Sequence, residues 1–234
     1  MKIYLCGQKF FGAKVFTLIR RLGHEVVGVS SPAANTRGDG PDKLAAAAKL
    51  HEVPWLESGK LNAHTLPDDV DLIVAAHSHD FIGRKTRMRA RLGAIGYHPS
   101  LLPRHRGRDA VRWALHMGDP ITGGSIYWLN DVMDGGPLAA QDWVWIRPGD
   151  TAEKLWRHDL FPLGLRLFEH VLRMVDAGTV VRIPQDEAVS TFEPAFDPPR
   201  KFRPDLEALP MPGAQQDVRI VTSVESLREV TAGA

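Results

Sequence analysis

The chain of 234 residues contains a single cysteine, Cys6, so it cannot form an intrachain disulfide. A lone thiol without a disulfide framework favours a reducing, cytoplasmic compartment. Cys6 follows the apolar residues Ile3, Tyr4 and Leu5. This run predicts a buried strand position for the thiol rather than a nucleophile.

Long apolar segments and an excess of one charge are also missing. No segment approaches the about 20 apolar residues needed to cross a bilayer, and the first residues lack the apolar stretch of a signal peptide. We therefore expect no membrane partner. Lys and Arg number 29 against 28 Asp and Glu, a formal net charge of +1. A near-neutral chain has no general attraction for polyanions, so we do not expect a nucleic-acid partner.

What the sequence does contain is the pattern of one sizeable α/β domain. Residues 1–6, 11–22 and 24–30 predict a strand, a helix and a strand, and this βαβ opening favours a mostly parallel sheet covered by helices. The turn at residues 7–12 does not fit Gly-x-Gly-x-x-Gly, which disfavours an NAD-dependent oxidoreductase. Later predicted strands cover 70–76, 94–98, 124–130 and 138–146, and later predicted helices cover 43–51, 109–117 and 151–176.

Two points along the chain interrupt this pattern. Pro162 lies inside the last predicted helix, which begins at a capping Thr151, and it is a candidate break. Six prolines then follow between residues 194 and 213. We expect a catalytic domain over residues 1–193 and a short Pro-rich C-terminal extension over residues 194–234.

The most informative residues are a histidine and an aspartate in two separate turns. His98 ends the apolar strand 94–98 and precedes the shape-fixing loop Ser100-Leu-Leu-Pro-Arg-His-Arg-Gly107; Asp134 lies in the Gly-rich turn 131–137. Sites of α/β proteins lie where parallel strands end. A histidine that donates to an oxyanion and a carboxylate that holds it charged are the groups that acyl-type transfer needs. A strand-capping role for His98, a plain hairpin role for Asp134 and a competing role for Asp131 stay open.

Two further clusters have both a functional and a simple interpretation. The segment His77-Ser-His-Asp80 resembles a metal cluster, but no cysteine or well-spaced third histidine supports it, so we expect a loop lining a pocket and no metal. Arg104 and Arg106 belong to a local basic cluster. This cluster is either a solvated loop or an anchor for a carboxylate or phosphate of a substrate.

The segment Tyr97-His-Pro-Ser-Leu-Leu-Pro-Arg-His-Arg-Gly107 resembles the signature loop of the folate-dependent formyltransferases. Within that family it is most similar to the amino-terminal hydrolase domain of 10-formyltetrahydrofolate dehydrogenases. The likeness extends over about residues 1–193 and includes His24-Glu-Val-Val-Gly-Val29, Phe81-Ile82, Asp134-Gly-Gly-Pro137 and Arg182-Ile-Pro-Gln185. It implies a Rossmann-like doubly wound, mostly parallel sheet with 10-formyltetrahydrofolate at its carboxyl edge.

The resemblance also implies roles for individual residues. His98 matches the catalytic histidine and Asp134 the essential aspartate of the family. Asp80, Phe81 and Ile82 match a segment that contacts the pterin, and the likeness suggests a cis peptide bond between Leu102 and Pro103. Ser100, Arg104 and Arg106 belong to the signature loop.

One position departs from the family pattern. Most family transferases have Asn two residues before the histidine as a second oxyanion donor, whereas this chain has Gly96. The hydrolase subgroup is also apolar at that place. Gly96 therefore favours that subgroup and leaves the oxyanion site one side-chain donor short.

The implied activity is transfer of the formyl group of 10-formyltetrahydrofolate, or its hydrolysis. The acceptor is an amine, a thiol or water. Methionyl-tRNA or amino-sugar formylation is an alternative. A folate-binding module with weak catalysis, as Gly96 suggests, is another.

Overall fold

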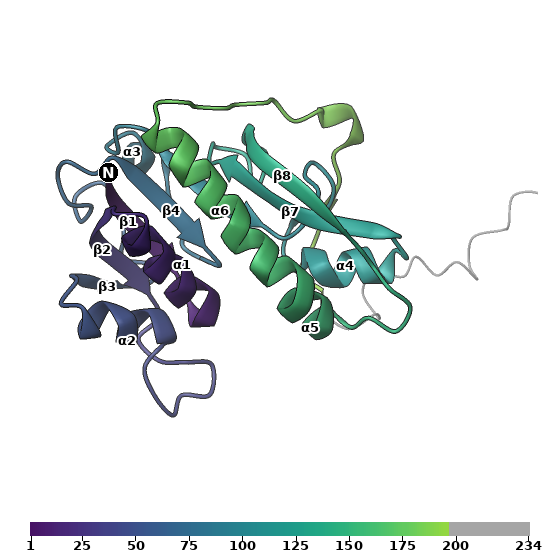
Figure 1. The fold of residues 1–234 in the computed structure, drawn as a ribbon, viewed down its shortest axis with the longest axis horizontal. Helices are drawn as coiled ribbons and strands as arrows, with labels where there is room; N and C mark the ends of the chain where they lie inside the picture. Colours follow the sequence, from purple (N-terminus) through teal and green to yellow (C-terminus); the bar gives the residue numbers. More distant parts are fainter. Residues whose placement is uncertain (197–234) are drawn as a thin grey trace, which may run out of the picture. The chain divides into compact units, whose positions relative to one another are not determined.

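A seven-stranded sheet organises residues 1–196, the part of the chain that the computed structural model describes (Figure 1). Its strands occur in the order β3-β2-β1-β4-β5-β7-β8. The first five are parallel, and β7 and β8 are antiparallel to their neighbours. The strands are β1 (Lys2–Gly7), β2 (Glu25–Ser31), β3 (Trp55–Glu57), β4 (Leu72–Ala76), β5 (Ala94–His98), β7 (Ile121–Trp128) and β8 (Leu138–Trp145).

Helices and short segments complete the fold. The α-helices are α1 (Lys9–Arg21), α2 (Lys43–Leu50), α3 (Arg84–Arg87), α4 (Ala110–His116), α5 (Ala152–Leu155) and α6 (Phe161–Asp176). A π-helical turn, η1 (Trp156–Leu160), joins the last two, and a 3-10 turn, η2 (Glu187–Val189), follows. Two short strands, β6 (Arg106–Gly107) and β9 (Phe192–Glu193), pair in parallel as a separate small sheet.

Apolar side chains cover both faces of the sheet. On one face α1 and α6 pack side by side, with the buried Phe11 in contact with Tyr97 and Phe168. On the other face a smaller cluster includes Cys6, which is fully buried as predicted, and Ile82. Among residues 1–196 no helix has the length and apolar character that crossing a bilayer requires.

The predicted α/β class and mostly parallel sheet are confirmed, and one local expectation is wrong. The structure does not break the last helix at Pro162. Instead, a five-residue π turn precedes α6, and Pro162 lies in its first turn, where a missing N–H is tolerated. Thr151 does cap α5, accepting from the backbone N–H of Lys154 at 3.2 Å. The expected extension 194–234 lies outside the described residues from residue 197 onward, and its boundary stays a prediction.

Candidate active site

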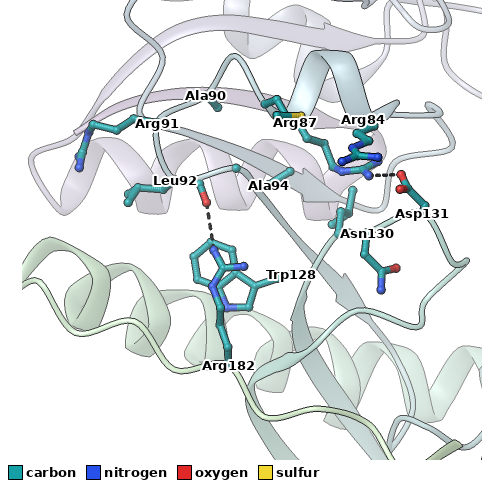
Figure 2. Close-up of a pocket in the computed structure, with 13 residues that line it drawn as sticks. Arg84, Arg87, Ala90, Arg91, Leu92, Ala94, Trp128, Asn130, Asp131 and Arg182 are labelled. Atoms are coloured by element: carbon teal, nitrogen blue, oxygen red, sulfur yellow. Dashed lines mark hydrogen bonds and ion pairs between the residues drawn. The ribbon is translucent and has the colours of Figure 1, made fainter.

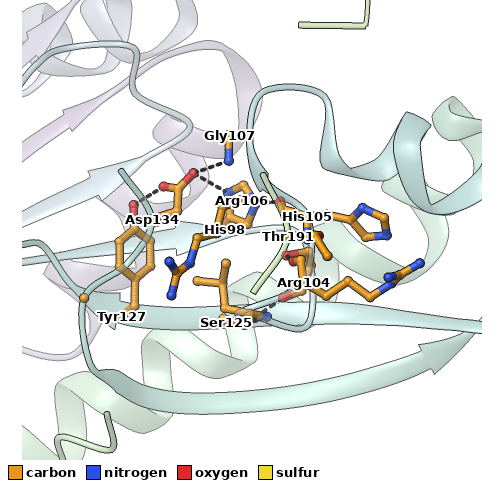
Figure 3. Close-up of polar contacts among 12 residues, drawn as sticks. His98, Arg104, His105, Arg106, Gly107, Ser125, Tyr127, Asp134 and Thr191 are labelled. Atoms are coloured by element: carbon orange, nitrogen blue, oxygen red, sulfur yellow. Dashed lines mark hydrogen bonds and ion pairs between the residues drawn. The ribbon is translucent and has the colours of Figure 1, made fainter. Parts of the chain in front are cut away.

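The fold brings the two central predicted residues together, as Figure 3 shows. His98 is the last residue of β5, and Asp134 lies in the connection between β7 and β8. β7 runs antiparallel to β5, so the connection begins beside the amino end of β5, with Trp128 opposite Ile95, and its later residues bring Asp134 to the His98 side chain. The Nδ1 atom of His98 lies 3.5 Å from Oδ2 of Asp134, and both side chains are largely buried. The hairpin interpretation of Asp134 and its proximity to the histidine are therefore compatible.

A backbone carbonyl fixes which nitrogen of His98 can exchange a proton. The Nε2 atom lies 2.6 Å from the carbonyl oxygen of His105. A carbonyl only accepts, so Nε2 must carry a hydrogen and donate it. The nitrogen that gains or loses a proton is then Nδ1, which faces Asp134. Nδ1 is therefore the ring nitrogen that is available as a proton donor or acceptor.

Asp134 is held by two donors besides facing His98. Its Oδ2 accepts from the backbone N–H of Gly107 at 2.8 Å, and its Oδ1 accepts from the hydroxyl of Tyr127 at 2.6 Å. The residue has φ of 50°, a left-handed conformation that Asp adopts more readily than most residues. These two contacts fix the orientation of the carboxylate beside His98.

The competing carboxylate, Asp131, faces a different part of the molecule. It is 65% exposed and pairs with Arg87 at 2.5 Å. Both residues line a cavity of about 590 Å³ at the amino end of β5, where Arg182 lies over the ring of Trp128 (Figure 2). His98 and Asp134 do not line this cavity. The geometry thus separates Asp131 from the histidine.

The basic cluster of the loop is used inside the chain. Arg104 pairs with Asp119 at 2.6 Å, and the guanidinium of Arg106 is 5% exposed and contacts Gln185 and Glu187. The solvated-loop interpretation is therefore wrong for Arg106. Arg106 makes four hydrogen bonds to Gln185 and Glu187, which leaves little of its guanidinium for a substrate. Arg104 uses two N–H groups on Asp119 and its side chain is 44% exposed, so the anchor interpretation of Arg104 stays a prediction.

Ser100 also has a structural role in this loop. Its hydroxyl donates to the carbonyl oxygen of Arg104 at 2.6 Å, and its own carbonyl accepts from the hydroxyl of Ser125 at 2.7 Å. The peptide bond between Leu102 and Pro103 is cis, as the resemblance suggests. These contacts fix the loop that presents the carbonyl of His105 to the catalytic candidate.

The sequence alone does not indicate the role of residues 185–193. This segment contacts both the loop after β5 and the turn that contains Asp134. The Gln185 amide donates to the carbonyl oxygens of Asp134 and Gly136 at 2.8 and 2.7 Å. Glu193 contacts the buried ring of His105 at 3.0 Å, and Asp119 contacts its other nitrogen at 2.7 Å. The sequence does mark one end of this segment, because Arg182-Ile-Pro-Gln185 is part of the resemblance. No local pattern indicates that Gln185 contacts the Asp134 turn.

The three residues expected at a pterin differ in their surroundings. Asp80 accepts from the hydroxyl of Ser30 at 2.6 Å and from the backbone N–H of Gly59 at 2.8 Å. The Phe81 ring is 88% exposed, whereas the Ile82 side chain is buried in the smaller core cluster. An exposed aromatic ring beside a fixed carboxylate offers a surface to a flat ligand, and Ile82 offers only its backbone.

The loop after β4 holds two histidines with unusual surroundings. The rings of His77 and His79 lie 5.9 Å apart, and His77 has φ of 58°. Within residues 1–196, no group of three or more His, Cys, Asp or Glu side chains is arranged to hold a metal ion. Burial, assisted by the charges of Lys9 and His79, lowers the pKa of His77 from 6.5 to about 4.

Replacing His77 by Asn is expected to flatten the pH dependence of stability in mild acid. Between pH 6.5 and 4 the unfolded chain binds a proton at His77 that the folded chain does not bind. The free energy of unfolding therefore falls as the pH drops, and H77N should avoid about 2–3 kcal/mol of this loss. Urea titrations at pH 7 and pH 4.5 measure the effect. Substituting the exposed His64 by Asn is the control, and equal pH dependence in the two variants would contradict the prediction.

Comparison with known proteins now adds to this geometry. Residues 24–160 match the family described as formyl transferase, which is more than half of the chain. The chain belongs to the formyl transferase family. Human cytosolic 10-formyltetrahydrofolate dehydrogenase is 36% identical over 203 residues, which cover 82% of this chain and 22% of that protein. The chain therefore spans about a fifth of the length of the 10-formyltetrahydrofolate dehydrogenases that it matches.

Other proteins similar to this formyl transferase differ in what their names say they act on. Methionyl-tRNA formyltransferase of Thermotoga maritima is 29% identical and covers 83% of this chain and 64% of its own length. The solved phosphoribosylglycinamide formyltransferase of Bacillus halodurans has a TM-score of 0.62 at 22% identity, covering 75% of this chain and 95% of its own. An N-formyltransferase of Helicobacter canadensis, in complex with folinic acid and dTDP-3-aminofucose, has a TM-score of 0.68 at 15% identity, covering 83% and 71%. These structures share the fold.

Proposed function

We propose that this protein removes the formyl group from 10-formyltetrahydrofolate and delivers it to an acceptor or to water. The observation that carries the proposal is the pair formed by Nδ1 of His98 and Oδ2 of Asp134, with Nε2 of His98 committed to a carbonyl. The dehydrogenase relatives are named for this folate, which supports the choice of donor. A cytoplasmic location stays a prediction.

The residues present fit such a substrate. The exposed Phe81 ring would lie against the flat pterin, next to the hydrogen-bonded Asp80. The bound folate would supply an electrophilic formyl carbon attached to N10. A protonated Nδ1 of His98 would donate to the formyl oxygen as negative charge develops there.

Asp134 would handle the charge and the proton. Its carboxylate favours the protonated imidazole of His98 and accepts the proton that the attacking amine, thiol or water loses. The bond from the formyl carbon to N10 breaks with its electron pair on N10, and N10 takes up the proton that Asp134 accepted from the nucleophile. The products are tetrahydrofolate and a formylated acceptor, or formate when water attacks.

A turnover assay with the full chain tests the proposal. 10-Formyltetrahydrofolate is supplied alone, then with an amino-sugar nucleotide, a phosphopantetheine thiol or charged initiator methionyl-tRNA, and tetrahydrofolate and formate are measured. We expect tetrahydrofolate to form in at least one arm. Formate in the first arm identifies a hydrolase, and dependence on one added acceptor identifies a transferase of that class.

The alternative, a folate-binding module with weak catalysis, is motivated by Gly96. Calorimetry separates it from the enzyme: tight binding of the folate with no loss of the formyl group in any arm would support the module. The same result would overturn the proposed catalytic function.

A further inference from the structure

The side chain of Tyr127 completes the surroundings of the His98–Asp134 pair. Tyr127 lies in β7 directly opposite Gly96 of β5. A Cβ atom on residue 96 would lie 3.3 Å from the Tyr127 ring and 3.1 Å from the side chain of Leu129. The ring therefore fills the space that a side chain at position 96 would take. Figure 3 shows its hydroxyl directed at the carboxylate of Asp134.

The hydroxyl of Tyr127 is the donor in this contact. Its oxygen lies 2.6 Å from Oδ1 of Asp134, and a carboxylate oxygen only accepts. Burial raises the pKa of the Tyr127 hydroxyl well above its usual value, and the charge of Asp134 raises it further. The phenol therefore faces the carboxylate as a neutral donor at neutral pH. A neutral donor facing a charged acceptor gives a hydrogen bond stronger than one between two neutral groups.

The two oxygens of Asp134 then have separate partners. Oδ1 receives the hydroxyl of Tyr127, while Oδ2 receives the N–H of Gly107 and faces Nδ1 of His98. Without the hydroxyl, the Gly107 N–H would be the remaining hydrogen bond to this carboxylate, and the plane of the carboxylate would be free to turn. Rotation would exchange the oxygen that faces the histidine.

We infer that Tyr127 is a positioning residue of this site: its hydroxyl holds the Asp134 carboxylate turned so that Oδ2 faces Nδ1 of His98. The inference rests on the proposed function, because it assigns Tyr127 to the same formyl chemistry. It also relates Gly96 to the site, since even a Cβ atom there would lie 3.3 Å from the tyrosine ring, closer than ordinary van der Waals contact.

The test is Tyr127→Phe, which removes the hydroxyl and leaves the ring over Gly96. We expect kcat for formyl release to fall about 10- to 100-fold while KM for the folate changes less than about threefold. The loss should appear in kcat and not in KM, because the hydroxyl orients Asp134 for the reaction and is not proposed to touch the folate.

The matched control is Tyr97→Phe. Tyr97 is also a buried tyrosine of this sheet, and its hydroxyl donates to the carbonyl oxygen of Leu160 at 2.8 Å, away from Asp134. This variant also loses a buried tyrosine hydroxyl and its hydrogen bond, here to a neutral carbonyl, so it reports the structural cost of such a loss in the same sheet. Its kcat should fall less than that of Y127F.

A second readout does not require turnover. The carboxyl-carbon NMR signal of Asp134 at neutral pH should move in Y127F relative to the wild type and stay in place in Y97F, because only Tyr127 contacts this carboxylate. An unchanged Asp134 signal in folded Y127F would overturn the inference, whether or not the wild type is active. A wild type that binds folate without releasing the formyl group would overturn only the proposed function, since the signal still reports the contact between Tyr127 and Asp134.

Discussion

Replacing His98 by Gln is expected to lower kcat for formyl release by about 10²- to 10³-fold, the usual cost of losing an oxyanion donor. A glutamine amide can still donate to the carbonyl oxygen of His105, as Nε2 of His98 does at 2.6 Å. It offers no group that can be protonated at the position of Nδ1, which faces Asp134. The variant therefore removes the chemistry of the ring and keeps the contact that orders the loop. Rapid-quench measurement of tetrahydrofolate gives kcat directly.

Two further variants separate this effect from misfolding. His98→Ala removes both contacts of the ring, so it should be at least as inactive as H98Q and less stable. His64→Gln changes an exposed histidine of a surface turn and should keep wild-type turnover. Near-normal kcat in folded H98Q would remove His98 from the mechanism.

The main sheet could be read from the sequence because its signals are local. The apolar runs and helical period of residues 1–30 predict a strand, a helix and a strand, and the structure contains β1, α1 and β2 there. The two short strands β6 and β9 have no comparable signal. Each has two residues and exists because the other lies beside it, so no local pattern marks either one.

The residues of the site also differ in how clearly the sequence marks them. His98 ends a strand and Asp134 lies in a Gly-rich turn, so both stand out by type and position, and the resemblance points to both. Tyr127 carries no such mark, because its importance comes from a hydroxyl aimed across two strands at a carboxylate. Arg106 shows the opposite case: the sequence suggests a surface cation, and contacts with the distant Gln185 and Glu187 make it a buried structural one.

Replacing Asp134 by Asn is expected to lower kcat by a similar factor, about 10²- to 10³-fold. The shape of the side chain is kept, but the amide is neutral and carries one oxygen and one NH2 group. Because the Gly107 N–H only donates, the amide oxygen keeps that contact and the NH2 group faces the Tyr127 hydroxyl. The hydroxyl can accept from the amide, but its own hydrogen then loses Asp134 as its acceptor, at about 1–3 kcal/mol of stability. Chemical denaturation measures this loss of stability, and turnover at saturating folate measures the loss of kcat.

The double variant H98Q/D134N then decides whether the two side chains act as one unit. If Asp134 works by keeping His98 charged and by taking the proton that the nucleophile loses, neither residue is effective without the other. The kcat of the double variant should then be little lower than that of the less active single variant. If the two acted independently, their losses would multiply to about 10⁴- to 10⁶-fold. A product of that size in a folded double variant would mean that the 3.5 Å approach of Nδ1 to Oδ2 does not couple the two groups in the reaction.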